Sequence, residues 1–329
     1  MRFKSVSRAV HGGRGSYIQT SEDKIIDFSA NLNPYPPDLD LSISPDMAMR
    51  YPDDDYQIIK EIISDFHHCS PDCITVGNGS VEVLRTLCHT FLNPGSTVFI
   101  PPHTFAEYEL SARLAGATLN KTESFSDIIF LCNPDNPTGK LVPRETILNK
   151  VHENDGNGLL CVDEAFIDLA DPEQSVSDTI HPNLFIMRSL TKSFAMAGVR
   201  FGYGIGDPEL IAAMEVMRPP WTVNVLAESL VKQAFASYNN LKFSREMIGT
   251  ERKRIINAVI DHGWKCQEGS ANFLFINTGK DASDVTGEFM HHKILVRDCS
   301  SFGYPTHIRV AIRTVEENNQ LINALKRVN

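Results

Sequence analysis

The sequence predicts an α/β protein with a large domain, in which helices flank a mostly parallel central sheet, and a smaller α+β domain. Between residues 56 and 187, short and fully apolar runs alternate with helical patterns, as in parallel sheets that are covered on both faces. After Trp221 the pattern changes to long helices followed by strands. The 329 residues are enough for one large and one smaller domain.

The N-terminal region, residues 1–41, is rich in glycine, proline and asparagine and holds one short apolar run, from Ile25 to Phe28. We expect an extended arm with one strand, which contributes to the small domain and to the active site. The large domain is expected to span residues 42–222, and the small domain residues 223–329.

The large domain is expected to alternate strands with helices along the chain. Isoleucines at helical spacing indicate a helix over Tyr56–Phe66, and Pro143 suits the first turn of another helix. The further expected helices are Val81–Leu92 and Tyr108–Ala115, and the expected strands are Ile74–Val76, Val98–Ile100, Ile128–Leu131, Leu159–Val162 and Phe185–Met187. Polar loops at the ends of such strands are the expected place for chemistry.

The small domain is expected to begin with two long helices and to continue with strands. Thr314 and Glu317 fit a capping box at the start of a last helix. The two long helices are expected over Leu226–Ser237 and Met247–His262, and the strands over Phe273–Ile276, Ile294–Val296 and Ile308–Ile312.

Charge and composition exclude several classes of function. The net charge of −10 argues against a nucleic-acid or membrane-surface partner, because both usually need a basic face. No apolar run of about 18 residues occurs, so we expect a cytoplasmic protein. The seven scattered cysteines are typical of reduced thiols. His67 to Cys73 has no second Cys/His pair nearby, so no metal site is expected.

A lysine at the end of a predicted strand is well placed to form a covalent bond with a ligand. The segment Ser189–Arg200 reads Ser-Leu-Thr-Lys-Ser-Phe-Ala-Met-Ala-Gly-Val-Arg, with Lys192 between a hydroxyl and a guanidinium that could both reach a phosphate. A Schiff-base lysine must lose its proton near neutral pH, which neighbouring cations and desolvation promote. The glycines at positions 202, 204 and 206 that follow do not fit the Gly-x-Gly-x-x-Gly pattern of a dinucleotide-binding loop.

Three further polar segments follow predicted strands of the same sheet. Gly77–Ser80 lies between a strand and a helix, where backbone N–H groups and the helix dipole can hold a phosphate. Asn133–Gly139 contains two Asn-Pro-type turns that can aim the Asn136 amide. Asp163 ends a core strand, where a buried carboxylate needs a cationic partner. An amine, a phosphate site, an amide and a carboxylate together meet the needs of pyridoxal 5′-phosphate.

In order and spacing, over nearly the whole chain, these segments resemble the fold-type I pyridoxal-phosphate enzymes, the aspartate aminotransferase superfamily. The resemblance implies that Lys192 carries the cofactor and shuttles protons, and that Asp163 binds the pyridine nitrogen. It implies that Asn136 binds the ring hydroxyl and that Phe105 stacks on the ring. The implied phosphate ligands are Gly79, Ser80, Ser189, Arg200 and, across a homodimer interface, Tyr51.

The resemblance also implies an anion-binding substrate site. Arg309 matches the arginine that grips a substrate carboxylate, and Arg297 matches one that binds a substrate phosphate. The arm reads His11-Gly12-Gly13 and later Asp27-Phe28-Ser29-Ala30-Asn31-Leu32-Asn33-Pro34. The further substrate ligands expected from the arm are His11, Arg14 and Asn33.

Within this superfamily the chain resembles two groups of enzymes, the L-threonine-O-3-phosphate decarboxylases of cobalamin side-arm synthesis and the histidinol-phosphate aminotransferases. The arm, the run Phe105-Ala106-Glu107-Tyr108 and Phe166, where the aminotransferases usually have a tyrosine, favour the decarboxylase. Its product would be (R)-1-amino-2-propanol O-2-phosphate. Transamination of histidinol phosphate or of another small amino acid is the alternative, because the same residues serve either reaction.

Overall fold

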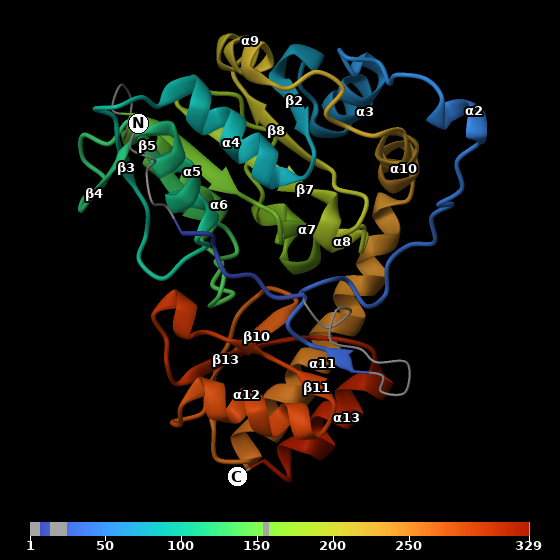
Figure 1. Ribbon diagram of the computed structural model, residues 1–329, viewed down its shortest axis with the longest axis vertical. Helices are drawn as coiled ribbons and strands as arrows, with labels where there is room; N and C mark the ends of the chain where they lie inside the picture. Colours follow the sequence, from blue (N-terminus) through green and yellow to red (C-terminus); the bar gives the residue numbers. More distant parts are fainter. Residues whose placement is uncertain (1–6, 14–24, 154–157, 329) are drawn as a thin grey trace.

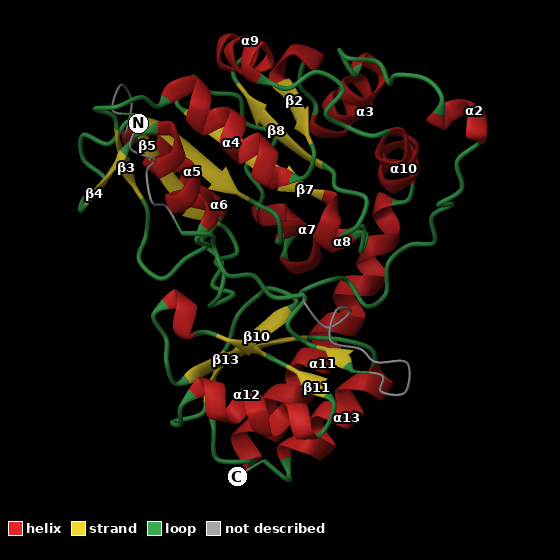
Figure 2. Cartoon of the chain, in the orientation of Figure 1, coloured by secondary structure: helices red, strands yellow, loops and turns green. Residues whose placement is uncertain are grey.

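The computed structural model describes residues 7–13, 25–153 and 158–328. In Figure 1 the molecule has an upper part and a lower part, and each part is built around a sheet. The long helix α11 (Leu241–Asp261) passes from one part to the other. Figure 2 shows helices around both sheets. Within the described residues, no helix is both long and apolar enough to cross a membrane.

The larger sheet has seven strands in the order β2-β8-β7-β6-β5-β3-β4. Six strands run parallel, and β8 (Gly202–Gly206) is antiparallel to both of its neighbours. The α/β fold with a mostly parallel sheet is thereby confirmed. The other strands are β2 (Ile74–Gly77), β3 (Thr97–Phe99), β4 (Thr118–Asn120), β5 (Ile128–Cys132), β6 (Leu159–Asp163) and β7 (Leu184–Ser189).

Helices bury both faces of this sheet, as the apolar strands predicted. One face packs against α4 (Ser80–Phe91), α5 (Glu107–Ala115) and α9 (Pro208–Met217). The opposite face packs against α3 (Gln57–His67), α6 (Arg144–Glu153), α7 (Ile167–Ala170) and α10 (Val225–Ala236). The carboxyl ends of the parallel strands meet at one edge of the sheet.

The smaller sheet is antiparallel, with the order β12-β13-β10-β9. The capping box at Thr314 is present at the start of the last helix, α13 (Val315–Leu325). The strands are β9 (Lys265–Gln267), β10 (Phe273–Asn277), β12 (Arg297–Asp298) and β13 (His307–Ala311), and α12 (Ala282–His291) packs beside them. The expected arm strand is β1 (Ile26–Asp27), which pairs in parallel with β11 (Ile294–Leu295).

The glycines at 202, 204 and 206, for which no element was predicted, form the buried strand β8. A side chain at Gly204 would place its Cβ 2.2 Å from the Phe185 ring, and one at Gly202 would place it 2.2 Å from the Ser80 nitrogen. Glycine is therefore required by close packing rather than by a flexible loop.

Other differences from the expected elements are smaller. Helix α11 begins at Leu241, six residues before the predicted Met247. The short helices α2 (Pro45–Ala48) and α8 (Leu190–Ser193), the helices α9 and α12, and the short strands β4, β9 and β12 were not predicted. Both α9 and α12 begin after an aspartate whose carboxylate caps the first turn, Asp207 and Asp281. These capping residues were sequence signals that could have located both helices.

Candidate active site

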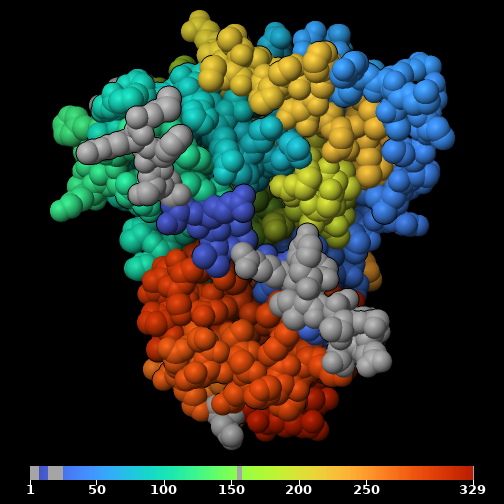
Figure 3. Space-filling view, in the orientation of Figure 1, coloured from blue at the N-terminus to red at the C-terminus, as the bar shows by residue number. Residues whose placement is uncertain are grey.

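A cavity of about 1380 Å³ lies between the carboxyl edge of the large sheet and the small sheet. Figure 3 shows residues 7–13 of the arm at the boundary between the two parts. Ten of the residues that the sequence predicted for the site line this cavity, namely His11, Ser80, Phe105, Asn136, Asp163, Ser189, Lys192, Arg200, Arg297 and Arg309. Residues more than 290 positions apart in the chain thus converge on one place.

Lys192 enters the cavity from α8, directly after β7. Ser189 ends the strand and its hydroxyl accepts a hydrogen bond from the Thr191 amide at 3.3 Å, which turns the chain into α8. The Lys192 ammonium lies 5.8 Å from the centre of the Phe166 ring. Burial, reinforced by Arg309 and Arg200, lowers the pKa of Lys192 to about 8. A substantial fraction of Lys192 is therefore neutral near physiological pH, as a nucleophilic amine requires.

The turn between β2 and α4 forms a cradle in which the start of a helix meets Arg200. Gly79 has a φ of 81°, and a Cβ there would lie 2.4 Å from the Arg200 Nη2 atom. The guanidinium of Arg200 is held by the Ala197 carbonyl at 3.0 Å. The positive end of α4, whose first residue is Ser80, thus stands beside a cation. This combination suits a phosphate group.

Asp163 is a buried carboxylate at the end of β6, with an exposed fraction of 5%. Its Oδ2 atom accepts a hydrogen bond from the Tyr108 hydroxyl at 2.6 Å, and its Oδ1 atom accepts one from the Ala165 amide at 3.0 Å. No ion pair links it to a basic side chain among the described residues. Burial raises the pKa of Asp163 to about 6. A cationic group placed in the cavity would compensate this charge, and a protonated pyridine nitrogen is such a group.

Arg309 and Arg297 lie side by side on neighbouring strands, where they are a register pair of β13 and β12. Both are buried, with exposed fractions of 6% and 8%. Arg309 donates to the Asn136 side-chain oxygen and, at 3.1 Å, to the Ser29 carbonyl. Burial, with a contribution from Arg297, lowers the pKa of Arg309 to about 10. The pair places two guanidinium groups beside the cavity, which suits the binding of an anion.

The arm covers the cavity through His11. Its Nε2 atom donates to the Glu107 carboxylate at 2.8 Å, and its ring lies 6.0 Å from that of Phe105. Arg297 donates to the Val10 carbonyl at 3.0 Å, so the arm also contacts the arginine pair. Gly13 is fixed by the Ser29 hydroxyl, which accepts from its amide at 2.8 Å.

Four predicted site residues do not line this cavity. Gly79 belongs to the turn beside it, where a Cβ would meet Arg200. Asn33 is a correction, because its amide donates to the Ser193 carbonyl at 2.7 Å and to the Ser244 hydroxyl at 3.0 Å, which fixes the arm rather than a substrate. Tyr51 is 79% exposed and packs against Trp221, away from the cavity of its own chain. Arg14 lies outside the described residues.

Two residues that contact the predicted site residues were not identified from the sequence. Tyr108 was noted only as part of a motif, although its hydroxyl binds Asp163. Glu107, the partner of His11, was missed as well. Neither contact has a signal in the sequence spacing, because each joins residues at least 55 positions apart.

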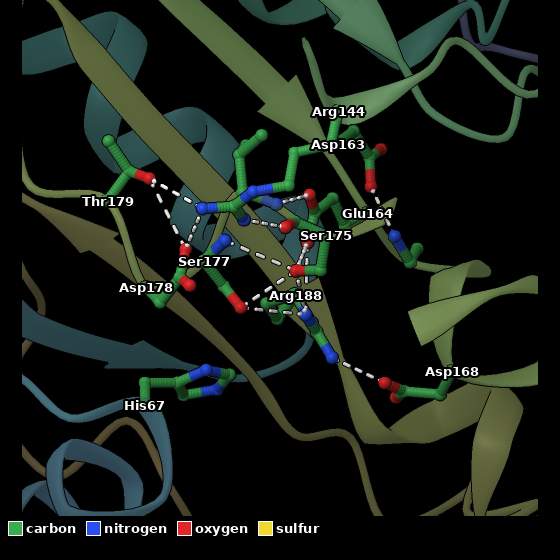
Figure 4. A network of polar contacts seen from close by, with 12 residues as sticks. His67, Arg144, Asp163, Glu164, Asp168, Ser175, Ser177, Asp178, Thr179 and Arg188 are labelled. Carbon is green, nitrogen blue, oxygen red and sulfur yellow. Dashed lines mark hydrogen bonds and ion pairs between the residues drawn. The ribbon is translucent and has the colours of Figure 1, made fainter. Parts of the chain in front are cut away.

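A buried polar network also lies beside the site (Figure 4). Arg188 donates to Glu164 at 2.9 Å and forms an ion pair with Asp168. The hydroxyls of Ser175 and Ser177 complete the contacts of its Nη1 atom. Arg188 lies four residues before Lys192, and Glu164 directly follows Asp163.

The fold and the cavity together define a class of protein, the pyridoxal-phosphate enzymes with a mixed seven-stranded sheet and a buried lysine. The family model described as aminotransferase class I and II matches residues 23–126 and 118–325. The chain belongs to this family, whose members depend on pyridoxal 5′-phosphate. The cradle at Gly79, the uncompensated Asp163 and the partly neutral Lys192 fit that cofactor.

Known proteins resemble the chain over most of its length. A histidinol-phosphate aminotransferase from Moorella thermoacetica is 28% identical, over 92% of this chain and 85% of the relative. The structure of a histidinol-phosphate aminotransferase from Sinorhizobium meliloti in complex with pyridoxal-5′-phosphate has a TM-score of 0.82 at 22% identity, covering 91% of this chain and 89% of that one. The structure of L-threonine-O-3-phosphate decarboxylase from Porphyromonas gingivalis has a TM-score of 0.76 at 20% identity, covering 86% and 91%.

Proposed function

We propose that the protein is a pyridoxal-phosphate-dependent decarboxylase of L-threonine O-3-phosphate, which forms (R)-1-amino-2-propanol O-2-phosphate for the side arm of cobalamin. The observation that carries this proposal is the pair of buried arginines, Arg309 and Arg297, beside the lysine. A substrate with one carboxylate and one phosphate provides an anion for each of them. Histidinol phosphate carries a phosphate but no carboxylate, so it offers no partner for the carboxylate-binding role of Arg309.

In this proposal the cofactor is held by the residues that converge on the carboxyl edge of the sheet. Lys192 forms the covalent bond, and Asp163 pairs with the pyridine nitrogen. Asn136 binds the ring hydroxyl and Phe105 covers the ring. The phosphate is held by Gly79, Ser80, Ser189 and Arg200. Bound pyridoxal phosphate supplies an electron-withdrawing ring that accepts the electron pair released at the substrate α-carbon.

The arginines decide which bond at the α-carbon is broken. Arg309 holds the carboxylate, while Arg297 holds the phosphate with help from His11 of the arm. The bond between the α-carbon and the carboxylate would then break. CO₂ would leave, and the electron pair of that bond would remain with the α-carbon fragment until a proton is added. Lys192 donates the proton that replaces the carboxylate.

The wall of the cavity near Lys192 favours loss of a charged group. Phe166 occupies this wall with an exposed fraction of 6%, and its ring packs edge-on against Phe273 at 5.2 Å. Once the bond breaks and the contact with Arg309 is lost, this apolar surface accommodates neutral CO₂ better than a charged group. A tyrosine hydroxyl at position 166 would have made this wall polar.

Transamination of histidinol phosphate is the second candidate, and the names of the sequence relatives favour it over decarboxylation. In that reaction Lys192 would remove the α-proton instead of donating one to the carbon that loses CO₂. The amino group would stay with the protein and pass to a keto acid. Another small amino acid could be the amino donor in the same chemistry. Identity of 28% leaves room for either reaction on the same cofactor site.

The deciding experiment incubates the cofactor-loaded protein with L-threonine O-3-phosphate in the absence of any keto acid and follows CO₂ release. The proposal expects sustained release over many turnovers. Absence of CO₂, together with amino transfer from histidinol phosphate to 2-oxoglutarate, would replace the proposal by the second candidate. The matched control is Lys192→Ala, which should release no CO₂.

We also propose that two chains form a homodimer with shared sites. Tyr51 is exposed and lies on Trp221, which is itself 48% exposed, so an aromatic surface faces outward near the large sheet. In the dimer, Tyr51 would reach the cofactor phosphate of the second copy. Tyr51→Phe should weaken cofactor binding without changing the sedimentation of the dimer.

A further inference from the structure

Tyr108 has a place in the site that the cofactor assignment does not use. The residue is fully buried on α5, and its hydroxyl donates to Asp163 Oδ2 at 2.6 Å. Asp163 receives its other hydrogen bond from a backbone amide, that of Ala165. Tyr108 is therefore the side chain that holds this carboxylate.

Two aromatic rings fix the direction of the Tyr108 hydroxyl. Its ring stacks on that of Phe130 with centroids 5.1 Å apart and an angle of 8° between the planes. Its other contact is edge-on to Phe105, at 5.4 Å and 81°. Phe105 lines the cavity, and Phe130 lies on β5, which pairs with the strand of Asp163. The tyrosine thus joins the ring that is proposed to cover the cofactor to the carboxylate that is proposed to bind its nitrogen.

We propose that Tyr108 is a positioning residue, which orients Asp163 toward the cofactor's pyridine nitrogen and keeps that carboxylate ionised. The inference rests on the proposed role of Asp163, and it holds for either candidate reaction. A hydrogen bond donated to a carboxylate stabilises its ionised form over its protonated form. An ionised Asp163 in turn keeps the pyridine nitrogen protonated, which the electron-withdrawing role of the ring requires.

The surroundings of Asp163 make this hydrogen bond important. Burial raises the pKa of Asp163, and the bond from Tyr108 is the largest effect that opposes the increase. The other titratable groups that act on it are Glu164, which directly follows β6, Lys192 on α8, Cys132 on β5 and Cys161 on β6. The pKa of Tyr108 is raised well above its ordinary value by burial and by Asp163, so the hydroxyl remains a donor.

The test compares two cofactors in the Tyr108→Phe variant. The first is pyridoxal phosphate, and the second is an analogue in which the ring nitrogen is replaced by C–H. We expect the variant to bind pyridoxal phosphate about tenfold more weakly, as for the loss of a hydrogen bond to a charged group, and to bind the analogue as wild type does. The pH midpoint of the bound cofactor's visible absorbance should shift by about half a unit. Turnover should fall about tenfold with the Michaelis constant changed less than about twofold.

Tyr203→Phe is the matched control, because Tyr203 is also buried and its hydroxyl bonds His67 at 2.9 Å, away from Asp163. It should leave cofactor binding and the absorbance midpoint unchanged. Equal weakening of both cofactors by Tyr108→Phe, or an unchanged midpoint, would show that Tyr108 has a packing role only and would overturn the inference.

Asp163→Asn separates this inference from the assignment on which it rests. If Asp163→Asn discriminates between the two cofactors and Tyr108→Phe does not, Asp163 binds the nitrogen without help from Tyr108, and the inference alone fails. If Asp163→Asn treats both cofactors alike, the assignment of Asp163 fails as well.

Discussion

Asp163 and Glu164 are neighbours in the chain and equally deep in the protein, with exposed fractions of 5% and 1%, yet their surroundings differ. Glu164 accepts hydrogen bonds from Arg188 at 2.9 Å, from the Ser175 hydroxyl at 2.5 Å and from the Val176 amide at 2.8 Å. Asp163 has two donors and, within the described residues, no ion pair with a basic side chain. Glu164 is thus paired with a basic side chain of the protein, whereas Asp163 is held by neutral hydrogen-bond donors only.

The difference follows from the geometry of a strand, because successive residues point to opposite faces. Asp163 shares its face with Tyr108 and Phe130 and lines the cavity. Glu164 points to the other face, toward Arg188 and Asp168 (Figure 4). Glu164, whose charge is compensated by Arg188, is therefore expected to have a structural role. Asp163, a buried carboxylate beside the cavity, is expected to bind a cationic group of a ligand.

The largest expected effect on turnover is that of replacing Lys192, which lines the cavity. Lys192→Ala removes both the covalent attachment of the cofactor and the proton donor, so turnover should fall by at least about 10²–10⁴-fold. The visible absorbance of the lysine-bound cofactor should disappear. Lys232→Ala, which changes an exposed lysine on α10, is the control and should retain both. Retention of turnover and absorbance by Lys192→Ala would end the pyridoxal-phosphate assignment of this lysine.

Glu164→Gln tests the carboxylate that is paired within the protein. Removing one partner of a buried ion pair leaves Arg188 undercompensated, and we expect a loss of about 3–5 kcal/mol in the free energy of unfolding. Urea unfolding of the cofactor-free protein measures this loss. Glu173→Gln changes an exposed glutamate and should cost almost nothing. A loss below about 1 kcal/mol for Glu164→Gln would mean that the network does not hold the strand ends.

Arg297→Ala tests whether this cavity residue binds the substrate phosphate. Loss of a charge-assisted contact to phosphate should raise the Michaelis constant for L-threonine O-3-phosphate roughly ten- to hundredfold. Cofactor affinity should not change, and Arg327→Ala, at an exposed position, serves as the control. Steady-state kinetics with unphosphorylated L-threonine provide the second arm. An equal effect on both substrates would contradict the assignment of Arg297 to the phosphate.

His11→Asn should have the smallest effect, because the His11 side chain is 48% exposed. A half-exposed ion pair contributes at most about 1 kcal/mol, so kcat/KM should fall about two- to fivefold. The hydrogen bond from His11 lowers the pKa of Glu107, and Glu107→Gln should therefore reproduce the effect of His11→Asn. Measurements on both variants and on their combination test the pair, and additive losses would show that the two residues act independently.

The sequence was sufficient for the alternation of strands and helices and for the convergence of the predicted cofactor residues on one cavity. Lys192, Asp163 and Asn136 each follow an apolar run, and parallel strands bring such positions to one edge. The β8 strand escaped prediction because its glycines interrupt the apolar pattern. The close contacts that exclude a side chain come from Phe185 at Gly204 and from the Ser80 backbone at Gly202.

Contacts between distant elements could not be predicted from the sequence. Asn33 was expected at the substrate, but its amide is used by Ser193 and Ser244, and the latter lies 211 positions away. Arg188 directly follows the predicted strand Phe185–Met187 and was not singled out in the sequence. Its role became visible only once Glu164 and Asp168 were placed beside it. The packing of the arm and of helices α7, α8 and α11, rather than spacing along the chain, brings these partners together.

The contrast between the two neighbouring carboxylates is tested most directly by unfolding the cofactor-free Asp163→Asn variant beside Glu164→Gln. The pKa of Asp163 is raised in the folded protein to about 6, so its ionised form opposes folding above pH 6, and the penalty declines as pH falls toward 3.8. Asparagine removes that charge, and its amide can donate to the Tyr108 oxygen.

At pH 8 we therefore expect Asp163→Asn to raise the free energy of unfolding by about 1–3 kcal/mol, while Glu164→Gln lowers it. Pyridoxal phosphate should stabilise the wild type more than Asp163→Asn. Opposite signs for the two variants would support a cavity whose charge is completed by the cofactor. Similar losses in both would contradict it, because Asp163 would then be as well paired by the protein as Glu164.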